Sequence, residues 1–163
     1  MKRANAKWHI GVDYRRLNGI TIKDKYLLPL RTTWKEQVDT SHIFAELELK
    51  LLPNLQCIVE GGEWKIAFET WYGLYEYWFM SFGLTNTPSC FQWHLNNILA
   101  VKINRGVVVY IHDILIYSKT EVTDIESIRW ILQNIMEHIL YINIDKCLFH
   151  ISEVDFRGFQ VGK

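Results

Sequence analysis

The segment VVVYIHDILIYS, residues 107–118, constrains the fold of this chain more than any other stretch of its sequence. Two runs of apolar, largely β-branched residues flank a short polar break. This pattern predicts a β-hairpin that carries His112 and Asp113 at its tip. If this acid and this histidine take part in a reaction, the chain is an enzyme. If they do not, it is an enzyme that has lost its activity.

Strand-like and helix-like segments alternate along the rest of the chain. Apolar or alternating runs predict strands at residues 8–14, 43–49, 146–151 and 154–161, and a hairpin or tight loop around the WYG triplet at residues 71–73. The spacing of apolar residues predicts helices at residues 33–40, 85–100 and 124–142. Mixed, largely antiparallel strands with helices on one face make an α+β domain.

The composition fits one globular domain without a membrane span. The chain has 163 residues, of which 49% are hydrophobic and 22% are charged, enough to bury a sizeable core. Its three cysteines form no C-x-x-C pair, so they favour neither a disulfide framework nor a zinc knuckle and indicate a reducing compartment. No apolar stretch approaches the length that crosses a bilayer, so we expect an intracellular protein without membrane contact.

Charge is unevenly distributed along a chain whose net charge is zero. Residues 1–35 contain nine Lys or Arg and only two Asp, so the remainder of the chain is acidic. A basic lobe joined to an acidic body suits phosphate contact at one end and a cation site in the other. A solvated basic face is an equally compatible interpretation of the same pattern.

Two acids stand at positions where neighbouring strands can bring them together. Glu48 lies in the alternating segment 43–49, and Asp113 lies at the predicted hairpin tip. Paired carboxylates at strand ends suit a divalent cation, because hard cations prefer oxygen ligands. Two solvated surface acids would give the same spacing.

Five segments together resemble the reverse transcriptase of gypsy-class LTR retrotransposons. In chain order they are GVDYRRLNGITIKDKYLLPL, FAELELK, EWKIAFETWYGLYEYWFMSFGLTNTPSCFQ, VVVYIHDILIYSK and LYINIDKCLFHISEVDFRGFQV. The resemblance implies the α+β fingers and palm of a right-hand polymerase, with the thumb absent. Fingers-like parts are expected at about 1–42 and 64–86, and palm-like parts at about 43–63 and 87–163.

The catalytic positions depart from the family pattern. Members of the family hold two Mg²⁺ ions with three aspartates, and the resemblance places Glu48, His112 and Asp113 at these three positions. Glu48 adds a methylene, and a misplacement of about 1 Å can cost about 10²-fold in rate. His112 removes a negative charge and offers nitrogen instead of oxygen. We therefore expect impaired Mg²⁺ binding and a catalytically defective copy, a pseudoenzyme.

The resemblance also assigns a nucleotide-binding role to five positions, which are His9, Pro53, Phe82, Gly83 and Gln92. His9 stands where the family supplies an arginine to the triphosphate, and Pro53 stands where it places an aromatic residue under the sugar. Phe82, Gly83 and Gln92 retain the family residues. The implied partners are an RNA or DNA template-primer and deoxynucleotide triphosphates.

Several alternatives remain open at the level of sequence. The chain could be a catalytically inert nucleic-acid-binding module, or an expressed relic of a retroelement with no selected activity. Two carboxylates and one imidazole at Glu48, His112 and Asp113 would also suit Mn²⁺ or Zn²⁺ better than Mg²⁺. The aromatic residues between positions 71 and 79 could stack on bases or pack against one another.

Overall fold

A computed structural model of the chain describes residues 11–26, 29, 34–35, 38–50, 57–81 and 83–162. The chain divides into two compact units, each built from two separate segments. The first unit comprises residues 1–23 and 53–87, and the second comprises residues 24–52 and 88–163. Each unit is described below by itself.

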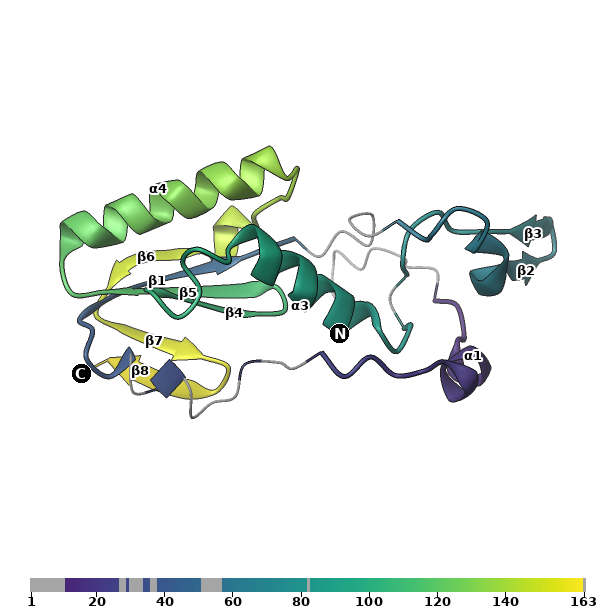
Figure 1. The fold of residues 1–163 in the computed structure, drawn as a ribbon, viewed down its shortest axis with the longest axis horizontal. Coiled ribbons are helices and arrows are strands. Elements are labelled where there is room, and N and C mark those ends of the chain that lie inside the picture. Colours follow the sequence, from purple (N-terminus) through teal and green to yellow (C-terminus); the bar gives the residue numbers. More distant parts are fainter. Residues whose placement is uncertain are drawn as a thin grey trace, which may run out of the picture. The chain divides into compact units, whose positions relative to one another are not determined.

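The second unit contains a four-stranded antiparallel sheet in the order β4-β5-β1-β6 (Figure 1). Its strands are β4 (Val107–Tyr110), β5 (Asp113–Ser118), β1 (Ile43–Glu48) and β6 (Leu148–Ile151). The predicted hairpin at 107–118 and the predicted strand at 43–49 are thereby confirmed. The predicted strand at 146–151 is confirmed for residues 148–151, because Lys146 belongs to the 3₁₀ helix η3 (Ile144–Lys146). The hairpin lies at one side of the sheet because β1, from much earlier in the chain, pairs with β5.

Two helices accompany this sheet. The helix α3 (Thr87–Ile98) leads toward the β4-β5 hairpin, and α4 (Glu121–Glu137) lies along β1 and β5 (Figure 1). The side chain of Thr120 caps α4 by accepting a hydrogen bond from the Thr123 amide. Buried Ile128, Ile131 and Ile135 repeat at helical spacing and give α4 the apolar face that the sequence predicts.

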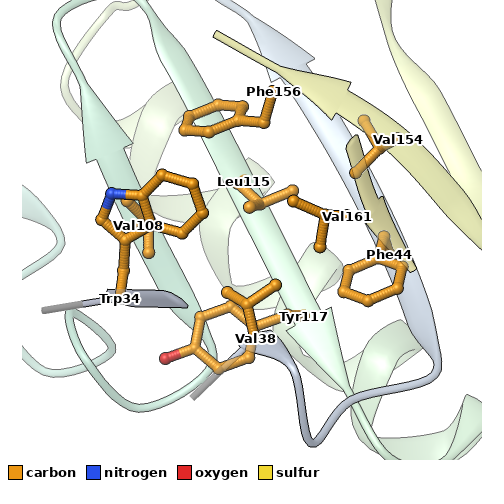
Figure 2. Close-up of a cluster of buried hydrophobic side chains, with 9 residues drawn as sticks. All are labelled: Trp34, Val38, Phe44, Val108, Leu115, Tyr117, Val154, Phe156 and Val161. Atoms are coloured by element: carbon orange, nitrogen blue, oxygen red, sulfur yellow. The ribbon is translucent and has the colours of Figure 1, made fainter. Parts of the chain in front are cut away.

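A hairpin of β7 (Glu153–Phe156) and β8 (Phe159–Gly162) closes a hydrophobic cluster on the sheet. Figure 2 shows the cluster, whose members are Trp34, Val38, Phe44, Val108, Leu115, Tyr117, Val154, Phe156 and Val161. The rings of Trp34 and Phe156 meet edge to face with their centroids 5.8 Å apart. This packing fixes the hairpin against the sheet.

The segment 154–161 is therefore a hairpin, whereas its sequence predicted a single strand-like run. Arg157 and Gly158 form the turn, with φ values of 57° and 80°. Two successive residues with positive φ match the tight turns that favour right-twisted hairpins. The Gly158 amide also donates to Asp155 Oδ1 at 2.9 Å.

The first unit contains α1 (Arg15–Ile20), the 3₁₀ helix η2 (Glu63–Ile66) and the hairpin of β2 (Phe68–Thr70) and β3 (Gly73–Tyr75). This hairpin confirms the prediction around residues 71–73. The predicted strand at 8–14 is wrong for residues 11–14, which precede α1 without strand structure, and residues 8–10 lie outside the described residues. Asp13 explains the difference, because its carboxylate accepts from the backbone and the guanidinium of Arg15 and turns the chain.

Of the predicted helix at 33–40, Trp34, Lys35 and Val38 are helical, Asp39 and Thr40 form a turn, and residues 33, 36 and 37 lie outside the described part of the chain. The three cysteines are free thiols. Among the described residues, no helix is both long and apolar enough to cross a membrane.

Candidate active site

The strand register places Glu48 directly opposite Asp113. These two residues are paired across β1 and β5, at the end of the sheet where the β4-β5 hairpin turns. Directly opposite residues of an antiparallel pair have their Cβ atoms about 4.5–5.5 Å apart. The two carboxylates therefore share one face of the sheet, as the sequence predicted, and His112 lies beside them in the two-residue turn between Tyr110 and Asp113.

Glu48 is held by two side chains that come from beyond α4. Lys146 Nζ donates to Glu48 Oε1 at 2.7 Å, and Asn143 Nδ2 donates to the same oxygen at 3.4 Å. Burial of Glu48 opposes its ionisation, but these hydrogen bonds outweigh burial and lower its pKa below the usual range. The carboxylate is thus charged and already neutralised by an intrinsic cation.

Asp113 is held by the β7-β8 hairpin. Arg157 Nη1 donates to Asp113 Oδ2 at 3.3 Å, and the guanidinium of Arg157 also lies 4.5 Å from the centroid of the Tyr110 ring. His112 Nε2 lies 3.5 Å from the other carboxylate oxygen, Oδ1. The Asp113 side chain is only 11% exposed, so little of it is open to solvent.

Glu46 is a third acid of this face that the sequence analysis missed. It lies two residues before Glu48 on β1, and burial together with the charges of Asp113 and Glu48 raises its pKa. The period-two spacing of Glu46 and Glu48 was a signal in the sequence that could have found it. Lys146 and Arg157 gave no such signal, because only the tertiary fold brings them to the face.

These side chains do not fit a pair of hard dications. At the three positions that the resemblance assigns to metal-binding aspartates, Glu48 pairs with Lys146 and Asp113 pairs with Arg157. The third position, residue 112, carries an imidazole instead of a carboxylate. Within the part of the chain that the structure describes, no group of three or more His, Cys, Asp or Glu side chains is arranged to hold a metal ion. Among the described residues, the buried Nδ1 atom of His112 has no hydrogen-bond partner, so none of them fixes this ring as a ligand by a second contact.

The side chain of Gln92 on α3 forms hydrogen bonds with the backbone of the β4-β5 hairpin. Its side chain is fully buried, its Oε1 accepts from the Ile111 amide at 2.6 Å, and its Nε2 donates to the Val109 carbonyl at 3.0 Å. Ile111 has a φ of 52°, a left-handed conformation that β-branched residues rarely adopt. Gln92 therefore positions the turn that carries His112, and its nucleotide-binding role stays a prediction.

Gly83 belongs to the first unit. Its φ of 97° lies in the region that favours glycine, and its carbonyl accepts a hydrogen bond from Asn18 Nδ2 at 2.7 Å. Asn18 Oδ1 in turn accepts from the Thr85 amide at 2.9 Å, so Asn18 fixes the whole turn. The other predicted nucleotide-binding positions, His9, Pro53 and Phe82, lie outside the described residues.

The Glu48 contacts predict a specific pH dependence of stability. Because the folded state lowers the pKa of Glu48, its pairing stabilises the fold fully above the unfolded value and less as the pH falls through the lower folded value. Glu48→Gln should thus reduce the free energy of unfolding by up to about 1 kcal/mol at pH 7. Urea denaturation between pH 7 and pH 3 should show this loss shrinking below pH ~4.5. A loss of constant size across the series would contradict the assignment.

The sequence of the chain is similar to those of known polyproteins. The profile of the family described as reverse transcriptase (RNA-dependent DNA polymerase) matches residues 36–161. The chain is 36% identical over 152 residues to the Transposon Tf2-3 polyprotein of Schizosaccharomyces pombe and, to the same extent, to the Transposon Tf2-4 polyprotein of that organism. The aligned stretch is 93% of this chain but 11% of each polyprotein, so the chain spans about a tenth of their length.

The fold is similar to those of solved foamy viral proteins. A crystal structure of a mutant prototype foamy virus protease-reverse transcriptase matches with a TM-score of 0.82 at 19% identity, over 100% of this chain and 22% of that one. The foamy viral protease-reverse transcriptase in complex with an RNA/DNA hybrid matches with a TM-score of 0.77 at 18% identity, over 92% of this chain and 20% of that one. These matches confirm the expected α+β fold of fingers and palm.

Proposed function

The chain belongs to the reverse transcriptase family, and on that premise we propose that it is the polymerase domain of a gypsy-class LTR retrotransposon polyprotein whose catalytic centre is defective. The chemistry of the family is RNA-directed DNA synthesis. The proposed site residues are Glu48, His112 and Asp113 at the catalytic positions, with His9, Pro53, Phe82, Gly83 and Gln92 around the nucleotide. Metal contact would fall to Glu48 and Asp113.

The observation that carries the proposed defect is the pairing of both carboxylates with intrinsic cations. Lys146 lies 2.7 Å from Glu48, and Arg157 lies 3.3 Å from Asp113. A dication would have to displace both contacts and would still find an imidazole where an aspartate belongs. Mg²⁺ is the family cofactor, and these features support impaired binding of it.

The proposed assignment of residue ranges to fingers and palm rests on the same family membership. We propose fingers-like parts at about 1–42 and 64–86 and palm-like parts at about 43–63 and 87–163. The two compact units of the structure have their boundaries near residues 23, 52 and 87. The proposed partners are a template-primer and deoxynucleotide triphosphates, by analogy with foamy viral relatives solved with an RNA/DNA hybrid and with double-stranded DNA.

Primer extension by the unaltered chain tests the proposal. A labelled primer on an RNA template should remain unextended, or be extended at least about 10²-fold more slowly than by an intact retroelement polymerase, in Mg²⁺. Parallel reactions in Mn²⁺ and Zn²⁺ test the alternative cofactors. Extension in Mg²⁺ at the rate of the intact enzyme would refute the defect.

A nucleic-acid-binding module is the second candidate, and exposed aromatic side chains of the first unit favour it. Trp71 and Tyr72 at the tip of the β2-β3 hairpin are almost fully exposed, and Trp78 is largely exposed. Beneath them, Phe68 stacks on both Tyr75 and Tyr77. The sequence left open whether these aromatic residues stack on bases or pack against one another. The hairpin contains exposed aromatic side chains, which are available for stacking on bases, and aromatic side chains that pack against each other.

Loss of the exposed indole should weaken binding to single-stranded RNA. Because stacking on one base contributes about 1–3 kcal/mol, Trp71→Ala should raise the Kd by at least about fivefold. Fluorescence anisotropy with a labelled oligoribonucleotide measures the change, and Trp93→Ala, an exposed tryptophan of α3, is the matched control. Equal effects of the two variants would remove this candidate, and absence of both extension and RNA binding would leave an unselected relic.

A further inference from the structure

The second unit contains a solvent-open pocket of about 500 Å³ that is remote from the carboxylates. It lies between the loop before β4, the end of β5 and the first turns of α4. Asp113 opens β5 and Ser118 closes it, so the pocket and the carboxylate face are separated by about 17 Å at the usual strand rise. The catalytic positions therefore contribute nothing to this pocket.

The pocket has a floor of buried hydroxyl groups. Ser41, Tyr117, Ser118 and Ser127 line it, and each of these residues is less than a tenth exposed. Ser127 accepts from Lys102 Nζ, so its hydroxyl hydrogen can be donated to an oxygen atom of an anion, whereas the Ser118 hydroxyl is hydrogen-bonded to Asp124. No exposed aromatic side chain lines the pocket, which disfavours stacking on a base.

Three cationic side chains line the same pocket, namely those of Lys102, Arg105 and Lys119. Lys102 Nζ lies 3.4 Å from the hydroxyl oxygen of Ser127, which joins the cations to the floor. Within the described part of the chain, none of the three forms an ion pair with a carboxylate. No described carboxylate is therefore paired with these three charges, in contrast to those of Lys146 and Arg157.

The backbone holds this loop in place before any ligand arrives. The Lys102 amide donates to the Leu99 carbonyl and the Arg105 amide donates to the Lys102 carbonyl, both at 2.9 Å. The Tyr117 amide donates to the Gly106 carbonyl, also at 2.9 Å. Gly106 has a φ of 100°, and a Cβ atom there would lie 3.3 Å from the Tyr117 carbonyl oxygen, so the tight approach to β5 requires glycine.

Two carboxylates near the pocket, those of Glu126 and Asp124, would repel a bound anion, but the surroundings of each reduce this repulsion. Glu126 lines the pocket and is exposed to solvent, where its charge is screened. Asp124 is fully buried behind Ser118, and His150 Nδ1 lies 2.8 Å from its Oδ2 atom. Three cations against one solvated carboxylate leave the lining with a net positive charge.

We propose that this pocket is a phosphate-binding site. Charged donors and hydroxyl groups that converge from three elements match the oxygen atoms of a phosphate, and the volume admits a group larger than the bare ion. The phosphate comes either from the backbone of a nucleic-acid strand or from a free phosphate. Because Glu48, His112 and Asp113 play no part, this site does not depend on the proposed polymerase activity.

Chemical-shift mapping of the ¹⁵N-labelled full chain tests the site with two probes. Sodium phosphate supplies the free dianion, and a 5′-hydroxyl oligothymidylate supplies only backbone diesters. We expect saturable shifts at the amides of Gly106, Ser118 and Thr123 with at least one probe. A response to phosphate alone identifies a free phosphate as the ligand, and a response to the oligonucleotide alone identifies the strand backbone. No saturable shift at these amides with either probe overturns the proposal.

Matched charge variants separate a built site from general electrostatics. Arg105→Gln should weaken binding by about fivefold or more, whereas Arg129→Gln, which removes the same charge from an exposed position of α4 outside the pocket, should change it by less than about twofold. Glu126→Gln should strengthen binding by about twofold, a gain that unfolding cannot produce. Equal losses in the two arginine variants, or no gain from Glu126→Gln, would refute a phosphate site.

Discussion

Primer extension should increase by at least about 10²-fold when Glu48 and His112 are both replaced by aspartate. Glu48→Asp shortens the side chain by one methylene and withdraws the carboxylate from Lys146 Nζ, which lies 2.7 Å from it in the unaltered chain. His112→Asp adds an oxygen donor and a negative charge beside Asp113, at the turn that Gln92 already holds. Glu48→Asp repositions a carboxylate that is already present, and His112→Asp supplies the missing oxygen donor, so the two changes together restore the ligands that a pair of hard cations requires.

The contact of Arg157 with Asp113 leads to a further prediction for the same experiment. Arg157 donates to Asp113 Oδ2 and therefore competes for the one aspartate that this copy retains. Adding Arg157→Leu to the double variant should increase extension again, by a few-fold, because the loss of one charge-assisted hydrogen bond is worth about 1 kcal/mol or more. Steady-state incorporation of labelled deoxynucleotides in Mg²⁺ measures each step.

Glu46→Asp is the matched control for the restored centre. It makes the same chemical change as Glu48→Asp on the same strand and the same face, two residues away. Extension should not appear in this variant, because Glu46 faces Leu115 rather than Asp113 in the register. If the restored chain stays silent, the defect lies elsewhere, and the altered nucleotide positions His9 and Pro53 become the next residues to restore.

The local pattern of the sequence allowed Glu48 and Asp113 to lie close together, but it fitted two solvated acids equally well and did not single out Glu46. Alternation along β1 and the apolar runs around His112 placed Glu48 and Asp113 on neighbouring strands, and the register pairs them directly. The cations of the face could not be predicted this way. Lys146 is 98 residues from Glu48 and Arg157 is 44 residues from Asp113, so only the packing of the β7-β8 hairpin and of the segment after α4 brings them in.

Two sequence-based predictions of local structure failed for different reasons. The segment at 8–14 carried strand-forming residues, but in its described part the bonds from Arg15 to Asp13 replace a strand ladder. The segment at 154–161 turns at Arg157 and Gly158, and Arg157 is not a typical turn residue. Its positive φ is stabilised by the following glycine and by contact with Asp113 and Tyr110, which are tertiary effects.

Gln92→Leu should lower the free energy of unfolding by about 2–4 kcal/mol. Leucine has a similar volume and fills the buried space, so the loss reports hydrogen bonding rather than a cavity. The substitution leaves the Ile111 amide without its acceptor at 2.6 Å and the Val109 carbonyl without its donor at 3.0 Å. A buried polar group without a partner costs about 1–3 kcal/mol, and two such groups lie in one hairpin here.

Gln133→Leu is the control for this prediction. Gln133 lies on α4, is exposed, and among the described residues donates only to Glu137 one turn later, so its replacement should change stability by no more than about 0.5 kcal/mol. Urea denaturation compares the two variants, and amide hydrogen exchange locates the effect. We expect faster exchange at Ile111 in Gln92→Leu, because the left-handed turn that carries His112 loses the acceptor that holds it. Similar small losses in both variants would mean that the turn is maintained by the β4-β5 ladder alone, and α3 would then have no part in positioning His112 and Asp113.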